Sequence, residues 1–255
     1  MNKRMPISFK VDDDLTGNWC NDDGVTTSQM EAISLITPIL ENFFMRTVAD
    51  ALPRPYQSDE LSQRCLSFIR EEANHSRVHR AFNKQLLNHM ERYPPGYAMI
   101  ESLLNYIRNN FSLSSKLLLA AALEHFAAVM SQVYMQREQT LDISSEYARE
   151  MFAMHAREEL GHCSVVFDLW FSRKAGGCLR RLIAILSILL VGGIYLSVAL
   201  PWILYRKNGR SLSATFKSLG RSIRNNWRDI KTSTPVSAIF AFVRRDYHPD
   251  SLLEG

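Results

Sequence analysis

The chain has 255 residues, of which 46% are hydrophobic and 22% charged, and its formal net charge at pH 7 is +4. This length and apolar content suffice for one substantial buried core. The four cysteines form no C-x-x-C pair, which argues against a zinc ribbon and a disulfide scaffold. The N-terminal end is acidic and the region after residue 172 is basic, and this asymmetry predicts an anionic surface as a partner.

The chain is expected to divide into three parts. Residues 1–27 are polar and rich in turn-forming residues, which predicts an arm across the folded domain. No apolar segment precedes the aspartates at 12–14, so we expect no secretory signal and a cytoplasmic location. A helical bundle is expected at residues 28–175, and a C-terminal part at residues 176–255.

Start and stop signals predict the helices of the bundle. Ser28 and Glu31 resemble a capping box at the start of the first helix, and Pro38 is expected to kink this helix. A Pro-Pro-Gly run ends the second helix. The expected helices cover residues 28–51, 58–92, 97–110, 112–139 and 144–173.

One pattern of glutamates and histidines occurs twice in these helices. In each half, a lone glutamate is followed on the next long helix by Glu-x-x-His. This is the ligand inventory of a two-metal site inside a four-helix bundle. The two copies consist of Glu41, Glu72 and His75, and of Glu124, Glu159 and His162.

The spacing of the pattern predicts the topology. Glu41 and Glu72 are 31 residues apart, and Glu124 and Glu159 are 35 apart, which suits two antiparallel helix pairs. The 52 residues from Glu72 to Glu124 allow the long crossover that joins such pairs in ferritin-like bundles. We therefore expect an all-α, ferritin-like four-helix bundle with a crossover between its second and third helices.

The chemistry of the pattern favours a metal site. Residues three apart lie on one face of a helix, so each Glu-x-x-His can direct a carboxylate and an imidazole at one ion. Glu41 and Glu124 lie in apolar segments, where an unpaired carboxylate is costly and a cation would compensate its charge. The alternatives are arginine ion pairs in the core and a solvated helix face.

Two more histidines extend the candidate ligand set. His79 follows His75 by four residues and His155 precedes Glu159 by four, so both can reach the same interior face. There they would serve as ligands or as groups that orient the ligands. The predicted metal ligands are thus Glu41, Glu72, His75, His79, Glu124, His155, Glu159 and His162.

Three neighbouring residues are less suited to bind metal. His125 follows Glu124 directly and is therefore turned about 100° away on a helix. Glu71 and Glu158 have no histidine three residues later, so their spacing makes them second choices. No catalytic residue beyond the metal ligands is predicted.

These segments also carry a resemblance to a known family. Residues 69–83, 122–127, 155–162 and 246–249, with the motifs E-A-x-H-x-x-x-H and H-x-x-E-E-x-x-H, are similar to the bacterial predicted metal-dependent hydrolases. The resemblance covers most of the chain. It implies an intracellular protein that requires a metal, and it adds weight to His79 and His155 as ligands. His248 lies in a similar Tyr-His-Pro segment, but Asp250 stands where a tryptophan is expected, so a turn at a helix end is the preferred interpretation.

The C-terminal part begins with a segment that favours membranes. Residues 182–205 carry no formal charge and are numerous enough to cross a bilayer. Gly192, Gly193 and Pro201 interrupt them, and basic residues flank both ends, so we expect a hairpin that dips into the cytoplasmic face of the inner membrane. A single span, a buried fifth helix and a dimer interface are the alternatives.

A basic amphipathic helix is expected next. Leu212, Phe216, Leu219, Ile223, Trp227 and Ile230 recur at intervals of three and four residues, and lysines and arginines fill the remaining face. Such a helix suits an anionic membrane surface. No phosphate loop, dinucleotide fingerprint or recognition helix supports nucleic acid as the partner.

Three classes of function remain open. We favour a di-iron enzyme that uses dioxygen to oxidise an apolar or lipid-derived substrate, because carboxylates and imidazoles suit iron or manganese. The second class is two-metal hydrolysis of an ester or phosphoester, in which the metals activate water. The third is metal binding without catalysis. Two metal ions are expected, with iron preferred to manganese or zinc, and the chain is a candidate homodimer.

Overall fold

The described part of the chain is helical. The computed structural model describes residues 15–52, 59–173, 177–233 and 235–252, with side chains described outside 225–233. These residues form no β-strand, only an isolated bridge between Cys20 and Ile143. The helices are α1 (Gly24–Ala51), α2 (Glu60–Met90), α3 (Tyr97–Asn110), α4 (Leu113–Arg137), α5 (Glu146–Phe171), α6 (Cys178–Lys207), α7 (Leu212–Ser233), α8 (Val236–Ala241) and the 3₁₀ helix η1 (Pro249–Leu252).

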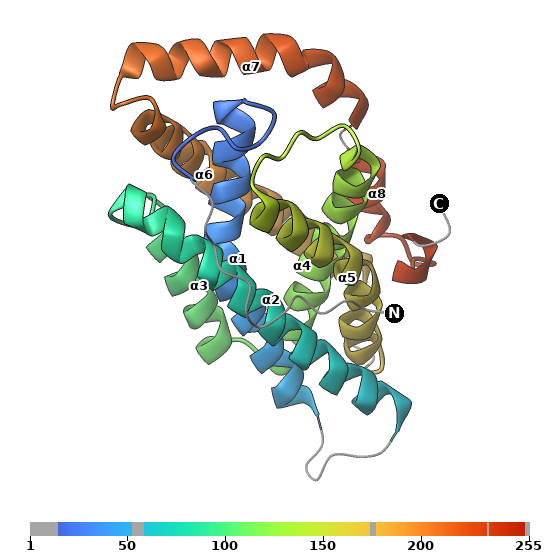
Figure 1. The fold of residues 1–255 in the computed structure, drawn as a ribbon. Coiled ribbons are helices and arrows are strands. Elements are labelled where there is room, and N and C mark those ends of the chain that lie inside the picture. Colours follow the sequence, from blue (N-terminus) through green and yellow to red (C-terminus); the bar gives the residue numbers. More distant parts are fainter. Residues whose placement is uncertain (1–14, 53–58, 174–176, 234, 253–255) are drawn as a thin grey trace.

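Four long helices form the bundle (Figure 1). Helix α1 packs along α2, and α4 packs along α5. The two pairs meet through contacts of α2 with α5 and of α1 with α4. Short helix α3 occupies the connection between the pairs and packs against α1 and α6. The predicted all-α class is confirmed, and this arrangement fits a ferritin-like bundle.

Side-chain caps fix the helix starts. Asp59, Ser112 and Ser145 each accept a hydrogen bond from the backbone N–H three residues later, close to the predicted starts. The predicted start of the first helix is wrong by about one turn, because Asp23 caps α1 through Thr26 N–H. Ser28 lies inside α1 and is buried.

Pro38 does not end α1, which runs through it. A proline has no N–H, so the carbonyl of Ser34, one turn earlier, lacks its usual helical donor. The Nδ2 of Asn83 on α2 donates to this carbonyl at 2.8 Å. A side chain of the neighbouring helix thus replaces the missing backbone hydrogen bond.

The predicted apolar hairpin is wrong, because α6 is one continuous helix through Gly192, Gly193 and Pro201. It packs against α1, α4 and α3. Helices α4 and α6 are both long and apolar enough to cross a membrane. Of the 18-residue apolar stretch in each helix, 56% is buried in α4 and only 17% in α6. The low burial of α6 leaves a large apolar surface uncovered by the described residues.

The described segments nearest the two chain ends pack onto the bundle. Residues 1–14 of the predicted arm lie outside the described residues. In the described part of the arm, Leu15, Trp19 and Cys20 are buried. Helix α8 packs on α4, and η1 packs on α5. His248 precedes η1 and pairs with Asp168 at 2.9 Å. The proposed domain boundaries stay a prediction.

Candidate metal centre

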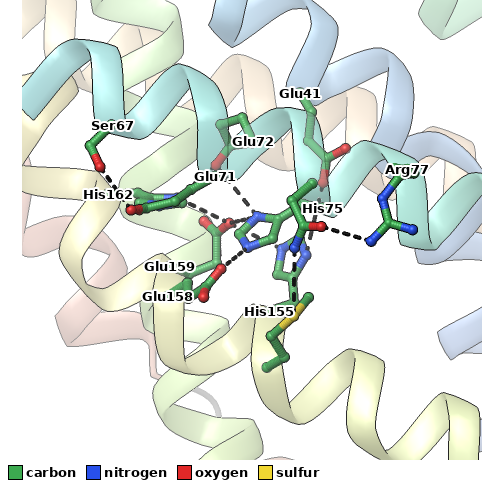
Figure 2. Close-up of polar contacts among 12 residues, drawn as sticks. Glu41, Ser67, Glu71, Glu72, His75, Arg77, His155, Glu158, Glu159 and His162 are labelled. Atoms are coloured by element: carbon green, nitrogen blue, oxygen red, sulfur yellow. Dashed lines mark hydrogen bonds and ion pairs between the residues drawn. The ribbon is translucent and has the colours of Figure 1, made fainter. Parts of the chain in front are cut away.

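The two Glu-x-x-His segments face each other across α2 and α5 (Figure 2). Glu72, His75, Glu159 and His162 are all buried, and each offers one ligand atom within 4.8 Å of the others. The Nδ1 of His162 lies 2.6 Å from Glu72 Oε1, and the Nδ1 of His75 lies 3.5 Å from Glu159 Oε1. Both imidazoles therefore direct Nδ1 into one group, which we call the first cluster.

Glu71 and Glu158 hold these imidazoles from outside. The Nε2 of His75 on α2 lies 2.7 Å from Glu158 on α5, and the Nε2 of His162 on α5 lies 2.9 Å from Glu71 on α2. Each carboxylate accepts the Nε2–H and so directs Nδ1 into the first cluster, where the Nδ1 lone pair would bind a cation once Nδ1 has lost its proton. The two contacts are equivalent, because in each a histidine of one helix pairs with a glutamate of the other. The sequence prediction ranked Glu71 and Glu158 as substitute ligands and missed this role.

A second cluster lies beside the first. Glu41, His79 and His155 offer ligand atoms within 4.8 Å of one another. The Nε2 of His155 lies 3.1 Å from Glu159 Oε1, and the rings of His155 and His75 stack at 4.4 Å. The two clusters are therefore adjacent and meet at His155 and Glu159, as a site for two neighbouring ions requires.

Glu124 belongs to neither the first nor the second cluster, although it lies in the same interior. Its carboxylate is buried without a hydrogen-bond partner among the described residues. Burial, followed by the negative charge of Glu159, raises the pKa of Glu124 well above its usual range. The carboxylate of Glu124 is thus available to a cation near the first cluster.

His79 is fixed by two buried residues that the sequence analysis missed. Ser34 Oγ donates to Asn83 Oδ1 at 2.8 Å and lies 2.8 Å from His79 Nδ1. A hydroxyl has one proton, so Nδ1–H of His79 must donate to Ser34 Oγ. The Nε2 lone pair of His79 then faces the second cluster, 3.1 Å from His155 Nδ1.

The electrostatics of the interior call for cations. Burial, reinforced by the carboxylate of Glu72, raises the pKa of Glu41 well above its usual range. Burial likewise lowers the pKa of His79, which keeps its imidazole neutral. Burial favours the neutral form of Glu72 too, but hydrogen bonds from His162 and His75 hold its pKa below the usual range. The interior therefore combines ionised carboxylates with carboxyls that lack a compensating charge.

The orphaned atoms converge on the two clusters. Among the described residues, both carboxylate oxygens of Glu41 and Glu124 lack a hydrogen-bond partner, and the Nδ1 atoms of His75 and His162 face only the carboxylates of the first cluster. No lysine or arginine of the described residues forms an ion pair with Glu41, Glu72 or Glu124, so the arginine alternative is not supported. Carboxylate oxygens and imidazole nitrogens gathered in this way are the donor set that iron, manganese or zinc accepts. These residues fit two metal ions, and their assignment as ligands stays a prediction.

His125 is placed as the sequence suggested, away from the clusters. Its Nε2 donates to the carbonyls of Ala238 and Ile239 on α8, at 3.1 and 3.0 Å. Tyr247 O–H donates to its Nδ1 at 2.7 Å. His125 therefore joins the C-terminal segment to α4 and has no nitrogen available for metal.

Comparison with known proteins agrees with a metal site. A family model described as "Predicted metal-dependent hydrolase" matches residues 3–252, which is nearly the whole chain. No curated protein and no solved structure matches it. The glutamate and histidine clusters lie within the matched region.

Proposed function

The chain belongs to the predicted metal-dependent hydrolase family, and from this premise we propose that it is a two-metal enzyme that oxidises an apolar substrate with dioxygen as the oxidant. The first ion would be held by Glu72, His75, Glu159 and His162, with Glu124 beside them. The second would be held by Glu41, His79 and His155. Iron is the metal we expect, because this mixture of carboxylates and imidazoles suits it.

One observation carries the proposal. The inner Nδ1 atoms of His75 and His162 face carboxylates of the first cluster, whereas their outer nitrogens are held by Glu158 and Glu71. A network of ion pairs alone would not leave the buried carboxylate of Glu124 without a partner among the described residues. An outer nitrogen held by a carboxylate, with the inner nitrogen turned towards a group of carboxylates, is typical of a site built for a metal.

The surroundings favour oxidation over hydrolysis. A pair of iron ions in a carboxylate and histidine site supplies activation of dioxygen. The chain contributes an enclosed interior, since Glu72, His75 and Glu124 have no exposed surface and Glu41 retains 2%, while the side chain of His155 retains 19%. Exclusion of water protects an oxidising centre from side reactions and suits an apolar substrate.

Hydrolysis is the second candidate, and the description of the family favours it. Two adjacent ions can lower the pKa of a bound water and polarise an ester or phosphoester oxygen. Glu158 retains 13% of its side-chain exposure and Glu71 37%, so they mark the side from which water would enter. On this mechanism the same ligands would hold zinc or manganese.

Anaerobic purification with the native metal distinguishes the two candidates. We expect two iron ions per chain and an absorption change on exposure to oxygen. Two zinc ions with no response to oxygen would overturn oxidation and leave hydrolysis. Ester and phosphoester cleavage without oxygen consumption would support that second candidate directly.

Variants test the ligand assignment independently of the reaction. Glu72→Ala and Glu159→Ala should each remove metal, measured as stoichiometry by elemental analysis. Glu150→Ala is the matched control, since Glu150 is an exposed glutamate of α5. Full metal content in Glu72→Ala and Glu159→Ala would refute the assignment.

A further inference from the structure

The outer faces of α6 and α7 are apolar and uncovered, and we infer that they bind the interface of an anionic lipid bilayer. The chain would lie on the membrane without crossing it. This inference does not depend on the reaction of the metal centre. It rests on the orientation of the two helices and on their charge.

Helix α7 presents its apolar side away from the protein. Thr215 and Ser222 are the buried residues of its described side chains. Leu212, Phe216 and Ile223 are 64%, 69% and 54% exposed. An amphipathic helix of a soluble protein normally buries its apolar face against the core. The reversed orientation of α7 therefore calls for an apolar partner outside the chain.

Helix α6 has the same character over a longer surface. Its inner face packs on the bundle, where Tyr195 O–H donates to the carbonyl of Ala32 at 2.8 Å. Its outer face exposes a row of apolar side chains at helical spacing, namely Leu179, Ile183, Leu186, Leu190, Ile194 and Val198. A row of this length is larger than the scattered apolar residues of an ordinary surface.

The attachment of α6 argues against a membrane span. Near its start, Arg181 donates to the carbonyls of Phe242 and Arg244. At its end, Lys207 pairs with buried Glu31 at 2.9 Å. One face of α6 is thus anchored to the bundle at both ends, so only the opposite face can meet lipid. This geometry is that of a helix lying in the interface.

Charge identifies the bilayer as anionic. Residues 178–224 contain eight lysines and arginines and no acidic residue. Four exposed members form no ion pair with a described residue, and they are Arg180, Lys217, Arg221 and Arg224. Basic residues beside an exposed apolar face are attracted to anionic headgroups. Figure 1 shows α7 lying across the end of the bundle at which α1 begins.

A second copy of the chain fits this surface less well. A twofold dimer would place the same patch on both partners. Basic residues would then face basic residues, with no acidic side chain in 178–224 to compensate them. An anionic bilayer satisfies both the apolar residues and the charges.

Flotation of the full chain with vesicles tests the inference. Binding is expected to vesicles of phosphatidylcholine and phosphatidylglycerol, and at least tenfold weaker binding to phosphatidylcholine alone. A variant with Leu212→Ser, Phe216→Ser and Ile223→Ser should lose at least tenfold in affinity for the anionic vesicles. The substituted side chains are exposed, so circular dichroism and metal content should remain those of the wild type.

Two further variants separate charge from general apolarity. Lys217→Gln combined with Arg221→Gln should weaken anionic binding severalfold and reduce its salt dependence. The matched control combines Tyr106→Ser on α3 with Phe111→Ser at the C-cap of α3, since these residues are 59% and 48% exposed, and it should bind as the wild type. The inference would be overturned if the α7 apolar variant bound anionic vesicles as tightly as the wild type. It would also be overturned if the wild type did not bind vesicles but formed a stable dimer that the variant did not form.

Discussion

Ser34 on α1 accepts a hydrogen bond from Nδ1 of His79 on α2, with 2.8 Å between the two atoms. Asn83 supports this contact, because it accepts from the Ser34 hydroxyl and donates to the Ser34 carbonyl that Pro38 leaves without a helical donor. The backbone hydrogen bond that Pro38 removes from α1 is thus replaced by Asn83, the same residue that helps to orient a histidine on α2. The Nε2 of His79 is presented to the second cluster as a consequence.

Replacing Ser34 by alanine should weaken metal binding at the second cluster. Without the hydroxyl, Nδ1–H of His79 loses its acceptor and the ring loses its fixed tautomer, so we expect affinity to fall roughly 10- to 100-fold. Metal titration of the variant measures the loss. Ser28→Ala is the control on the same helix, because Ser28 is buried and its Oγ has no hydrogen-bond partner among the described residues. Equal affinities of the two variants would contradict the positioning role.

Glu71 and Glu158 should behave as equivalent positioning residues. Glu71→Ala and Glu158→Ala each remove the acceptor of one Nε2–H, at His162 and His75 respectively. We expect each to lower metal affinity roughly 10- to 100-fold without emptying the site, in contrast to Glu72→Ala. Isothermal titration measures both effects. An exposed control, Glu150→Ala, should bind as the wild type, and complete metal loss in Glu71→Ala would instead make Glu71 a ligand.

Metal binding should release protons. Burial and neighbouring carboxylates raise the pKa values of Glu41 and Glu124, so both carry protons in the metal-free chain at a higher pH than ordinary glutamates do. A cation must displace these protons, and affinity should therefore fall as the pH is lowered. Calorimetry in buffers of different ionisation enthalpy counts the protons released. Glu124→Gln should release about one proton fewer, and an unchanged number would show that Glu124 is already ionised.

Glu31 should make the protein less stable as the pH rises towards neutrality. Burial raises its pKa to about 7 despite Lys207 and the Trp19 N–H. The folded chain then binds more protons than the unfolded chain between pH 4.5 and about 7, so the free energy of unfolding falls over that interval, by at most about 3 kcal/mol from this group.

Denaturation at several pH values checks this expectation. Glu31→Gln keeps an acceptor for Trp19 but does not titrate, so the difference in unfolding free energy between variant and wild type should increase from pH 5 to pH 7. The variant and the wild type are both measured without metal, so metal release does not contribute to the unfolding free energy of either. A difference that does not change with pH would show that Lys207 keeps Glu31 ionised.

Much of the fold follows from local sequence signals. The caps at Asp59, Ser112 and Ser145 act within one turn, so the starts of α2, α4 and α5 could be predicted closely. The start of α1 was misplaced because Ser28 and Glu31 imitate a capping box. Glu31 instead pairs with Lys207, which is 176 positions away and invisible to a local pattern.

The C-terminal part shows the same limit. Gly192, Gly193 and Pro201 suggested a hairpin, since each weakens a helix in isolation. Packing of α6 along α1 and α4 outweighs these local preferences and keeps the helix continuous. The amphipathic pattern of α7 was legible in the sequence, but only the fold shows that its apolar side faces outward.

The sequence by itself determined the class of fold and the eight residues gathered in the interior, because helical spacing fixes which side chains share a face. Tertiary structure decided that seven of them form two clusters with Glu124 outside both, and which groups orient them. Glu71 meets His162, and Ser34 meets His79, only when separate helices pack together. Contacts between helices depend on packing across the whole core, and no local spacing encodes them.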